Sequence, residues 1–161
     1  MIDNHSEISF FVPGIPRPGG SKQPFINRKT GRMFVKEDCE KNPQWRTDVK
    51  VFALPVAPET PWLGPLALDV DFFFPRIKGH FGTGKKADIL KATAPAHHTV
   101  KPDRTKILRA LEDALTGLIW RDDAQIVDGR IRKFYVKEGE APLPGARVTV
   151  RRLVDGKDGE S

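Results

Sequence analysis

Three aspartates placed around one predicted helix are the residues of this sequence best suited to bind a metal ion. Asp103 stands just before the helix, and Asp122 and Asp123 follow shortly after its end. Carboxylates held close together repel one another unless a cation compensates them, and oxygen ligands without nitrogen or sulfur neighbours suit Mg²⁺ or Mn²⁺. Such an ion can activate water and stabilise the charge that develops on a phosphodiester during hydrolysis.

Simpler roles compete with metal binding at these positions. Asp103 follows Pro102, where a carboxylate can accept hydrogen bonds from free backbone N–H groups, so an N-cap is the default interpretation for Asp103 alone. Asp122 and Asp123 are adjacent and should point in different directions. We expect Asp123 to be a metal ligand, while Asp122 is a second ligand, a cap or solvated.

The helix that must position these aspartates is predicted from about residue 104 to 117. Its buried face lies within an arc of about 120° and is formed by Ile107, Leu108, Leu111, Ala114, Leu115 and Leu118. The other side is polar, and Arg109 there can pair with Glu112 or Asp113.

The length of this helix predicts where the chain returns. The helix is roughly 21 Å long, and about six extended residues after a turn at Gly117 would cover the same distance. On this geometry Asp123 arrives beside Asp103, and the two carboxylates share one metal site.

Patterns along the chain predict an α/β domain of the α+β type, in which a mixed, mainly antiparallel sheet is packed by two main helices. Turn residues and apolar alternation indicate strands at 7–14, 66–75, 124–139 and 145–153. We place the domain over 1–153 and a flexible tail over 154–161.

Two details of these elements can be predicted. The first helix runs from about Pro43 to Leu54, with Trp45, Val49 and Phe52 facing inward. Asp69 and Asp71 alternate on one strand, where an outward polar face is a better explanation than a metal pair.

Composition favours one globular domain with an anionic partner. The chain has 161 residues, 39% of them hydrophobic, which suffices for a single core. Twenty-seven Lys and Arg against 21 Asp and Glu give a net charge of +6, which favours a polyanion as the binding partner.

The single cysteine, Cys39, cannot form an internal disulfide, and no apolar run approaches the roughly 20 residues of a membrane span. We expect a cytoplasmic protein without a membrane anchor.

Two segments concentrate the basic residues. The segment 13–36 has six basic residues and no acidic one: Arg17, Lys22, Arg28, Lys29, Arg32 and Lys36. The segment 76–103 includes Lys85, Lys86 and Lys101. Charge alone leaves open whether each segment faces phosphate or is simply solvated.

Two other signals in the second segment are weak. Its "GTGKK" lacks the spacing of a nucleotide-binding loop, so no nucleotide cofactor is expected. His97 and His98 should point apart in extended chain, which argues against a shared metal and favours solvent exposure.

Two stretches resemble the RusA-type Holliday junction resolvases, which are small dimeric endonucleases of phage and prophage origin. "FFVPGIPRPGGSKQPF" resembles the opening strand and basic loop of that family. "KPDRTKILRALEDALTGLIWRDDAQIVD" resembles its signature segment, with "KPD", "DALTG" and "DDAQIVD" in order. The resemblance covers most of the chain and implies a RusA-like fold.

The resemblance also implies roles for individual residues. Asp103 and Asp123 match metal-binding aspartates of the family, Arg109 stands at the position of a catalytic basic residue that is often lysine, and Asp113 matches the aspartate of "DAL". These four residues are the expected catalytic set, with Asp122 as a further metal ligand.

The sequence departs from the family pattern at one position. The family reads Asp-x-Asp after "KP", and here Thr105 occupies the second aspartate position. A neutral hydroxyl is a much poorer ligand for Mg²⁺ than a carboxylate. We hypothesise that Glu112 or Asp122 compensates for the missing carboxylate.

The resulting expectation is a Mg²⁺- or Mn²⁺-dependent homodimer that cuts four-way DNA junctions in the bacterial cytoplasm. The expected DNA-binding residues are Arg17, Lys22, Lys85, Lys86 and Lys101. Two alternatives stay open: an accessory protein that binds branched DNA but has lost cleavage through Thr105, and a nuclease acting on flaps or forks.

Overall fold

The computed structural model describes residues 6–19, 29–30, 42–139 and 143–155, and the backbone of two further strands over 22–26 and 33–37. Three sequence predictions fall partly or wholly outside this range. They concern the basic segment 13–36, of which Arg28, Arg32 and the side chains of Lys22 and Lys36 lie outside, the thiol of Cys39, and most of the predicted tail.

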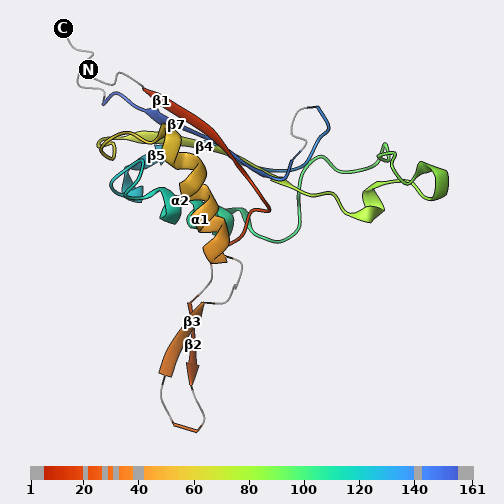
Figure 1. Ribbon diagram of the computed structural model, residues 1–161, viewed down its shortest axis with the longest axis horizontal. Helices are drawn as coiled ribbons and strands as arrows, with labels where there is room; N and C mark the ends of the chain where they lie inside the picture. Colours follow the sequence, from red (N-terminus) through yellow and green to blue (C-terminus); the bar gives the residue numbers. More distant parts are fainter. Residues whose placement is uncertain are drawn as a thin grey trace.

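A five-stranded mixed sheet forms the centre of the molecule (Figure 1). Its central strand, β4 (Leu66–Phe74), pairs antiparallel with β7 (Gly145–Arg152), which pairs antiparallel with β1 (Glu7–Pro13). Along its other edge β4 pairs parallel with β5 (Ile126–Asp128) and then β6 (Ile131–Tyr135). The predicted mixed, mainly antiparallel sheet is confirmed.

The strand predicted over 124–139 is interrupted. Gly129, with a φ of 141°, separates β5 from β6. β6 and β7 run in opposite directions but do not pair with each other, because β4 lies between them. A parallel β4–β6 pair requires a long crossover, and α2 (Arg104–Leu115) lies within that connection.

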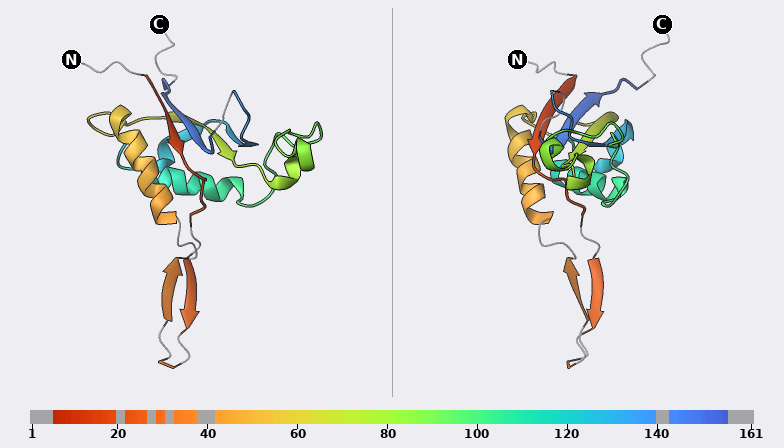
Figure 2. Two further views of the ribbon diagram at one scale, coloured as in Figure 1. Left: turned by 45° about the vertical axis from the view of Figure 1, so that its right-hand side comes forward. Right: turned by 90° about the vertical axis from the view of Figure 1, so that its right-hand side faces the viewer.

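The two predicted helices cover one face of the sheet (Figure 2). α1 (Asn42–Ala53) continues into a short 3-10 turn, η1 (Leu54–Val56). Trp45 and Val49 are buried, as predicted, but Phe52 is 42% exposed, so its predicted inward position is wrong. Ala53 is buried in its place, so the elements that pack against α1, rather than the spacing of an ideal helix, decide which of the two side chains is covered.

Alternation along β4 separates the two faces of the sheet. Leu68, Val70 and Phe72 join the core formed with the helices, including Ile107 and Leu111 of α2. The intervening aspartates point to the other face, which confirms the outward polar face predicted for β4.

A second sheet consists of β2 (Lys22–Ile26) and β3 (Met33–Glu37), paired antiparallel. This hairpin extends away from the main sheet (Figures 1 and 2). Among the described residues, no helix is long and apolar enough to cross a lipid bilayer.

The histidine pair differs from its prediction. His97 is exposed, but only 8% of His98 is, and its ring stacks on Phe74 with the ring centres 3.8 Å apart. The exposure predicted for His98 is wrong. Residues 96–98 run along β6, as the hydrogen bond from Tyr135 N to Ala96 O at 2.9 Å shows. Neighbouring side chains of an extended segment point to opposite sides, so His98 is turned inward while His97 is exposed.

Candidate functional site

Asp103 occupies the N-cap position of α2, as its sequence context predicts. Its carbonyl accepts from the backbone N–H groups of Lys106 at 3.1 Å and Ile107 at 3.2 Å. Within the described part of the chain, however, the carboxylate accepts no capping hydrogen bond. It lies 3.7 Å from Lys106 Nζ, and its side chain is 59% exposed. The carboxylate oxygens therefore stay accessible to a ligand.

β6 passes beside this end of α2. The guanidinium of Arg104 donates to Ile131 O at 3.5 Å, and Lys133 Nζ donates to Val100 O at 2.8 Å. Burial lowers the pKa of the Lys133 ammonium, and the charge of Asp103 opposes that shift. Asp103 and Lys133 are thus electrostatic neighbours.

The path after α2 differs from the extended return that the sequence suggested. The helix ends at Leu115, and Gly117, with a φ of 87°, turns the chain so that its N–H donates to Trp120 O at 2.7 Å. A 3-10 turn, η4 (Asp123–Gln125), follows. These two turns occupy residues that were expected to be extended, and farther along the chain Ile131 of β6 contacts Arg104 at the start of α2.

Gln125 fixes the segment that carries the two adjacent aspartates. Its amide nitrogen donates to Trp62 O and Gly64 O, each at 2.9 Å. Its amide oxygen accepts from the backbone N–H groups of Arg121 at 3.0 Å and Asp122 at 2.8 Å. One side chain therefore ties η4 to the loop before β4.

Asp122 and Asp123 have different surroundings, as their adjacency predicts. Asp122 caps η4, with its Oδ1 accepting from Ala124 N at 2.9 Å, and forms a capping box with Gln125. Asp123 is the first residue of η4, and its side chain is exposed.

Asp123 lies near the C-terminal half of α2, where it joins two other carboxylates. Burial raises the pKa of the Glu112 carboxyl, and the charges of Asp123 and then Asp113 raise it further. Asp113 also lies 3.6 Å from the guanidinium of Arg46 on α1. Among the described contacts, Asp113 therefore pairs with Arg46 of α1, and not with Arg109 as the helix spacing suggested.

Arg109 and Thr105 occupy the exposed side of α2 between its two ends. Arg109 follows Thr105 by four residues and precedes Glu112 by three, spacings that place side chains on neighbouring turns of one side. A guanidinium thus stands between the N-terminal aspartate and the C-terminal carboxylates.

The described electrostatic interactions link the predicted site residues in two sets. One contains Asp103 with Lys106 and Lys133, and the other contains Asp123 with Glu112. Within the described ranges, no group of three or more Asp, Glu, His or Cys side chains is arranged to hold a metal ion.

The donor chemistry nevertheless fits a hard divalent cation. Asp123 and Glu112 supply carboxylate oxygens whose mutual repulsion a cation would relieve. Mg²⁺ commonly binds one or two carboxylates and completes its shell with water and substrate phosphate oxygens. Two protein carboxylates therefore suffice for the ion that the sequence predicted.

The residues expected to bind DNA lie in four places. Arg17 is half-buried in the loop that crosses α2, where Gly19 N donates to Lys106 O at 3.1 Å. Lys101 is exposed two residues before Asp103, and Lys85 and Lys86 are exposed in η3 (Gly84–Lys86). Lys22 begins β2, and its side chain lies outside the described residues.

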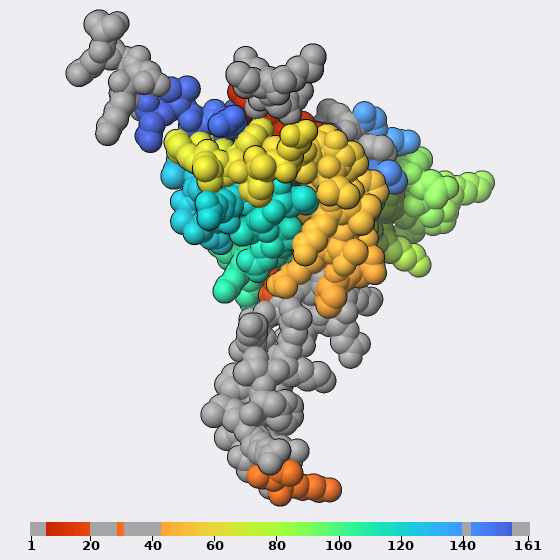
Figure 3. Space-filling model, turned by 60° about the vertical axis from the view of Figure 1, so that its left-hand side comes forward, coloured from red at the N-terminus to blue at the C-terminus, as the bar shows by residue number. Residues whose placement is uncertain are grey.

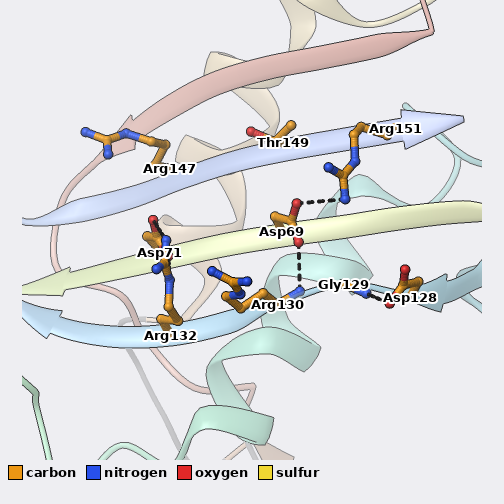
Figure 4. A pocket seen from close by; sticks show the side chains of 9 residues that line it. All are labelled: Asp69, Asp71, Asp128, Gly129, Arg130, Arg132, Arg147, Thr149 and Arg151. Carbon is orange, nitrogen blue, oxygen red and sulfur yellow. Dashed lines mark hydrogen bonds and ion pairs between the residues drawn. The ribbon is translucent and has the colours of Figure 1, made fainter.

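The face of the sheet away from the helices has a hollow of about 560 Å³ (Figure 4). Arg132 forms a two-pronged pair with Asp71 at 2.7 and 2.9 Å, and Arg151 lies 3.0 Å from Asp69. Because Asp71 and Asp69 each pair with an arginine here, we assign these two aspartates to sheet stability rather than to the metal site.

Sequence reasoning missed two residues near the site, Gln125 and Lys133. Gln125 could have been found, because Asp-x-x-Gln starting at Asp122 is a capping-box pattern. Lys133 carries no such signal, since its position beside Asp103 depends on the parallel pairing of β6 with β4.

Comparison with known proteins identifies the family of this chain. The family model described as "Endodeoxyribonuclease RusA" matches residues 15–151. The "Uncharacterized protein YqaN" of Bacillus subtilis (strain 168) is 30% identical over 146 residues, which cover 91% of this chain and 96% of that protein. The match spans β4, α2 and η4 together, the elements that position the acidic residues. The chain therefore belongs to the RusA endodeoxyribonuclease family.

Proposed function

We propose that this protein is a divalent-metal-dependent endonuclease that resolves four-way and other branched DNA junctions by phosphodiester hydrolysis. Its setting would be phage or prophage DNA recombination, repair or packaging in the bacterial cytoplasm. The observation that carries the proposal is the approach of Asp123 to Glu112 on α2, next to Arg109, in a chain of net charge +6 and of an endonuclease family.

Mg²⁺ or Mn²⁺ would be held by Asp123 and Asp103, with Glu112 or Asp122 as the further ligand. When bound, the ion would activate water and stabilise negative charge on the phosphate. Asp122 already caps η4 through one carboxylate oxygen, so Glu112 is the better substitute for the carboxylate missing at Thr105.

The remaining residues would orient the substrate. Arg109 would stabilise charge on the scissile phosphate, because a guanidinium matches phosphate geometry. Gln125 would keep η4 in place, so that Asp123 faces α2. Arg17, Lys85, Lys86 and Lys101 would hold the DNA backbone, which predicts an affinity that falls steeply with salt.

A two-fold homodimer suits this substrate. A four-way junction has approximate two-fold symmetry, and a symmetric dimer presents two identical sites to two strands of like polarity. We infer one cleavage site per protomer.

A labelled four-way junction incubated with Mg²⁺ tests the proposal. The native protein should produce symmetric nicks, and Asp123→Asn should bind the junction without cutting it. Asp128→Asn is the matched control, because the Asp128 carboxylate contacts only the backbone of Gly129 among the described residues. Native protein that neither binds nor cuts the junction would refute the proposal.

A non-catalytic junction-binding protein is the second candidate. Thr105 and the lack of a three-ligand group among the described residues favour it. If the protein only binds junctions, the native protein should slow the junction in the gel but leave its strands uncut. A nuclease preferring flaps or forks would instead cut those substrates faster than the junction.

The role of Glu112 can be tested by calorimetric titration with Mg²⁺. Glu112→Gln should weaken Mg²⁺ binding, and Asp122→Asn should weaken it less. Equal affinities in both variants and the native protein would remove the compensation hypothesis.

A further inference from the structure

Residues 77–94, called the arm below, project from the body of the molecule between β4 and α2 (Figures 1 and 3). Two 3-10 turns, η2 (Lys78–His80) and η3, lie within it. Gly82 N donates to Ile89 O at 2.9 Å, and Lys91 N donates to His80 O at 2.9 Å. These hydrogen bonds close the arm on itself, so it has a defined shape.

The base of the arm is anchored to the end of β6. His80 is only 8% exposed, and its ring meets the Tyr135 ring edge-on at 4.6 Å. Arg76 Nε donates to Val136 O at 3.1 Å, and its Nη1 donates to Pro95 O at 2.7 Å. Arg76 therefore ties the strand that enters the arm to the segment that leaves it.

The segment that leaves the arm is fixed as far as the candidate site. His98 N donates to Lys133 O at 3.2 Å, and Val100 O accepts from Lys133 Nζ at 2.8 Å. Asp103 follows three residues after Val100. The arm consequently has a set direction relative to the start of α2.

The surface of the arm combines positive charge with exposed aliphatic groups. It contains four lysines and one acidic residue, Asp88. Ile77 is 61% exposed, Ile89 58% and Leu90 43%. Adjacent apolar residues on an ordered, basic projection are unusual for a purely solvated loop, because they contribute nothing to the core.

We infer that the arm is the element that recognises the branch point: its lysines bind phosphates, and Ile89 and Leu90 contact base faces that are exposed where duplexes diverge. This inference rests on the proposed function. Lysines attract any duplex, whereas an aliphatic side chain that contacts a base face must first unstack that base in linear duplex, a cost that is smaller where duplexes diverge. The arm therefore adds selectivity for branched DNA over linear duplex.

Binding measurements in EDTA, which prevents cleavage, test the inference. The two ligands are a fluorescent four-way junction and a linear duplex of the same sequence. The double variant Ile89→Ser/Leu90→Ser should lose about tenfold in junction affinity, the order expected for removing two apolar contacts, and keep its duplex affinity. The matched control is Val51→Ser/Leu54→Ser on α1 and η1, whose side chains are 57% and 65% exposed. It should leave both affinities unchanged.

Two further measurements separate the roles of the arm. Lys85→Ala/Lys86→Ala should weaken junction and duplex binding alike, and should reduce the slope of log affinity against log salt by about 0.9 for each phosphate that the variant no longer neutralises. A 2-aminopurine base at the branch point should brighten when native protein binds, and should stay dim with Ile89→Ser/Leu90→Ser.

The outcomes distinguish this inference from the proposed function. An unchanged ratio of junction to duplex affinity in Ile89→Ser/Leu90→Ser, with junction binding intact, would overturn the role of the arm only. Native protein that does not bind the junction at all would overturn both.

Discussion

Gln125 shows how one side chain can hold a candidate catalytic residue without contacting substrate. All four of its hydrogen bonds go to backbone groups, two before β4 and two before η4. Asp123, within the turn so fixed, has no comparable anchor of its own among the described contacts. The position of Asp123 therefore depends on a neighbour two residues away.

Replacing Gln125 should affect both stability and the site. Gln125→Ala removes four hydrogen bonds and should lower the free energy of unfolding by about 2 kcal/mol, measured by urea denaturation. Junction cleavage should fall more than junction binding, because Asp123 loses its position. Gln44→Ala is the control, since Gln44 bonds only Asp48 at an exposed i,i+4 pair, and should cost less than about 0.5 kcal/mol. Equal losses in the two variants would contradict the role assigned to Gln125.

His98 should make stability depend on pH. Burial, assisted by the charge of Lys133, lowers the pKa of its imidazole. Among the described residues, its Nδ1 has no hydrogen-bond partner. The unfolded chain then binds the proton more tightly than the folded protein, so stability falls as the pH drops below about 6.5. The loss of stability levels off once the pH has fallen below the pKa that His98 has in the folded protein.

His98→Phe should keep the ring contact with Phe74 but remove this part of the acid destabilisation. The difference in free energy of unfolding between His98→Phe and the native protein should therefore shift in favour of the variant as the pH falls through about 6. Thermal denaturation across a pH series measures the effect, with the exposed His97→Phe as control. A native-like pH profile for His98→Phe would show that the imidazole is not responsible.

At the scale of elements, Gly129 allows two strands to follow one another along the same edge of β4. A Cβ at this position would lie 1.8 Å from Leu68 O, and its φ of 141° strains any residue with a side chain. Gly129→Ala should therefore cost at least about 3 kcal/mol of stability, or prevent folding.

Gly139→Ala is the matched control for Gly129→Ala. Gly139 also has a positive φ, 85°, but no described atom lies within 4 Å of an added Cβ. It should cost about 1 kcal/mol through backbone strain alone. Similar melting temperatures for the two variants would mean that the contact with Leu68 does not matter.

Elements with strong local periodicity could be predicted from the sequence. The apolar arc of α2 and the alternation of β4 depend only on near neighbours, so α2 and both faces of β4 were placed correctly. Phe52 and His98 were not, because their exposure depends on what packs against them. The break at Gly129 was missed for a related reason: a glycine inside an apolar run indicates a bend only once the neighbouring strand is known.

The candidate site could be predicted only in part. The residue types and their order gave the acidic set, but the path after Gly117 was assumed to be extended. Two compact turns replace it, and the charge of Asp123 acts on Glu112, while the charge of Asp103 acts on Lys133. Such turns depend on long-range bonds such as Gln125 to Trp62, which span 63 residues and leave no local pattern.

At the scale of the whole molecule, the proposed function requires coordination between two sites. Under that proposal one protomer of 18.0 kDa carries one cleavage site, and a four-way junction is resolved only when two strands are cut. A homodimer supplies both sites in one complex. Coordination of two cuts, rather than cleavage as such, is therefore the property that distinguishes a dimeric resolvase from a general nuclease.

Mixed dimers test this coordination. Native chains can be co-expressed with a large excess of differently tagged Asp123→Asn chains. Most native chains should then pair with a variant chain, which gives dimers with one active site. On a supercoiled plasmid with an extruded cruciform, native dimers should produce linear DNA by two paired cuts, whereas purified mixed dimers should produce nicked circles. The two-fold axis of the dimer gives the physical reason, since each site reaches only one of the two symmetry-related strands. If mixed dimers produced linear DNA at the native ratio, each protomer would be acting alone on both strands, and the paired-site arrangement would be wrong.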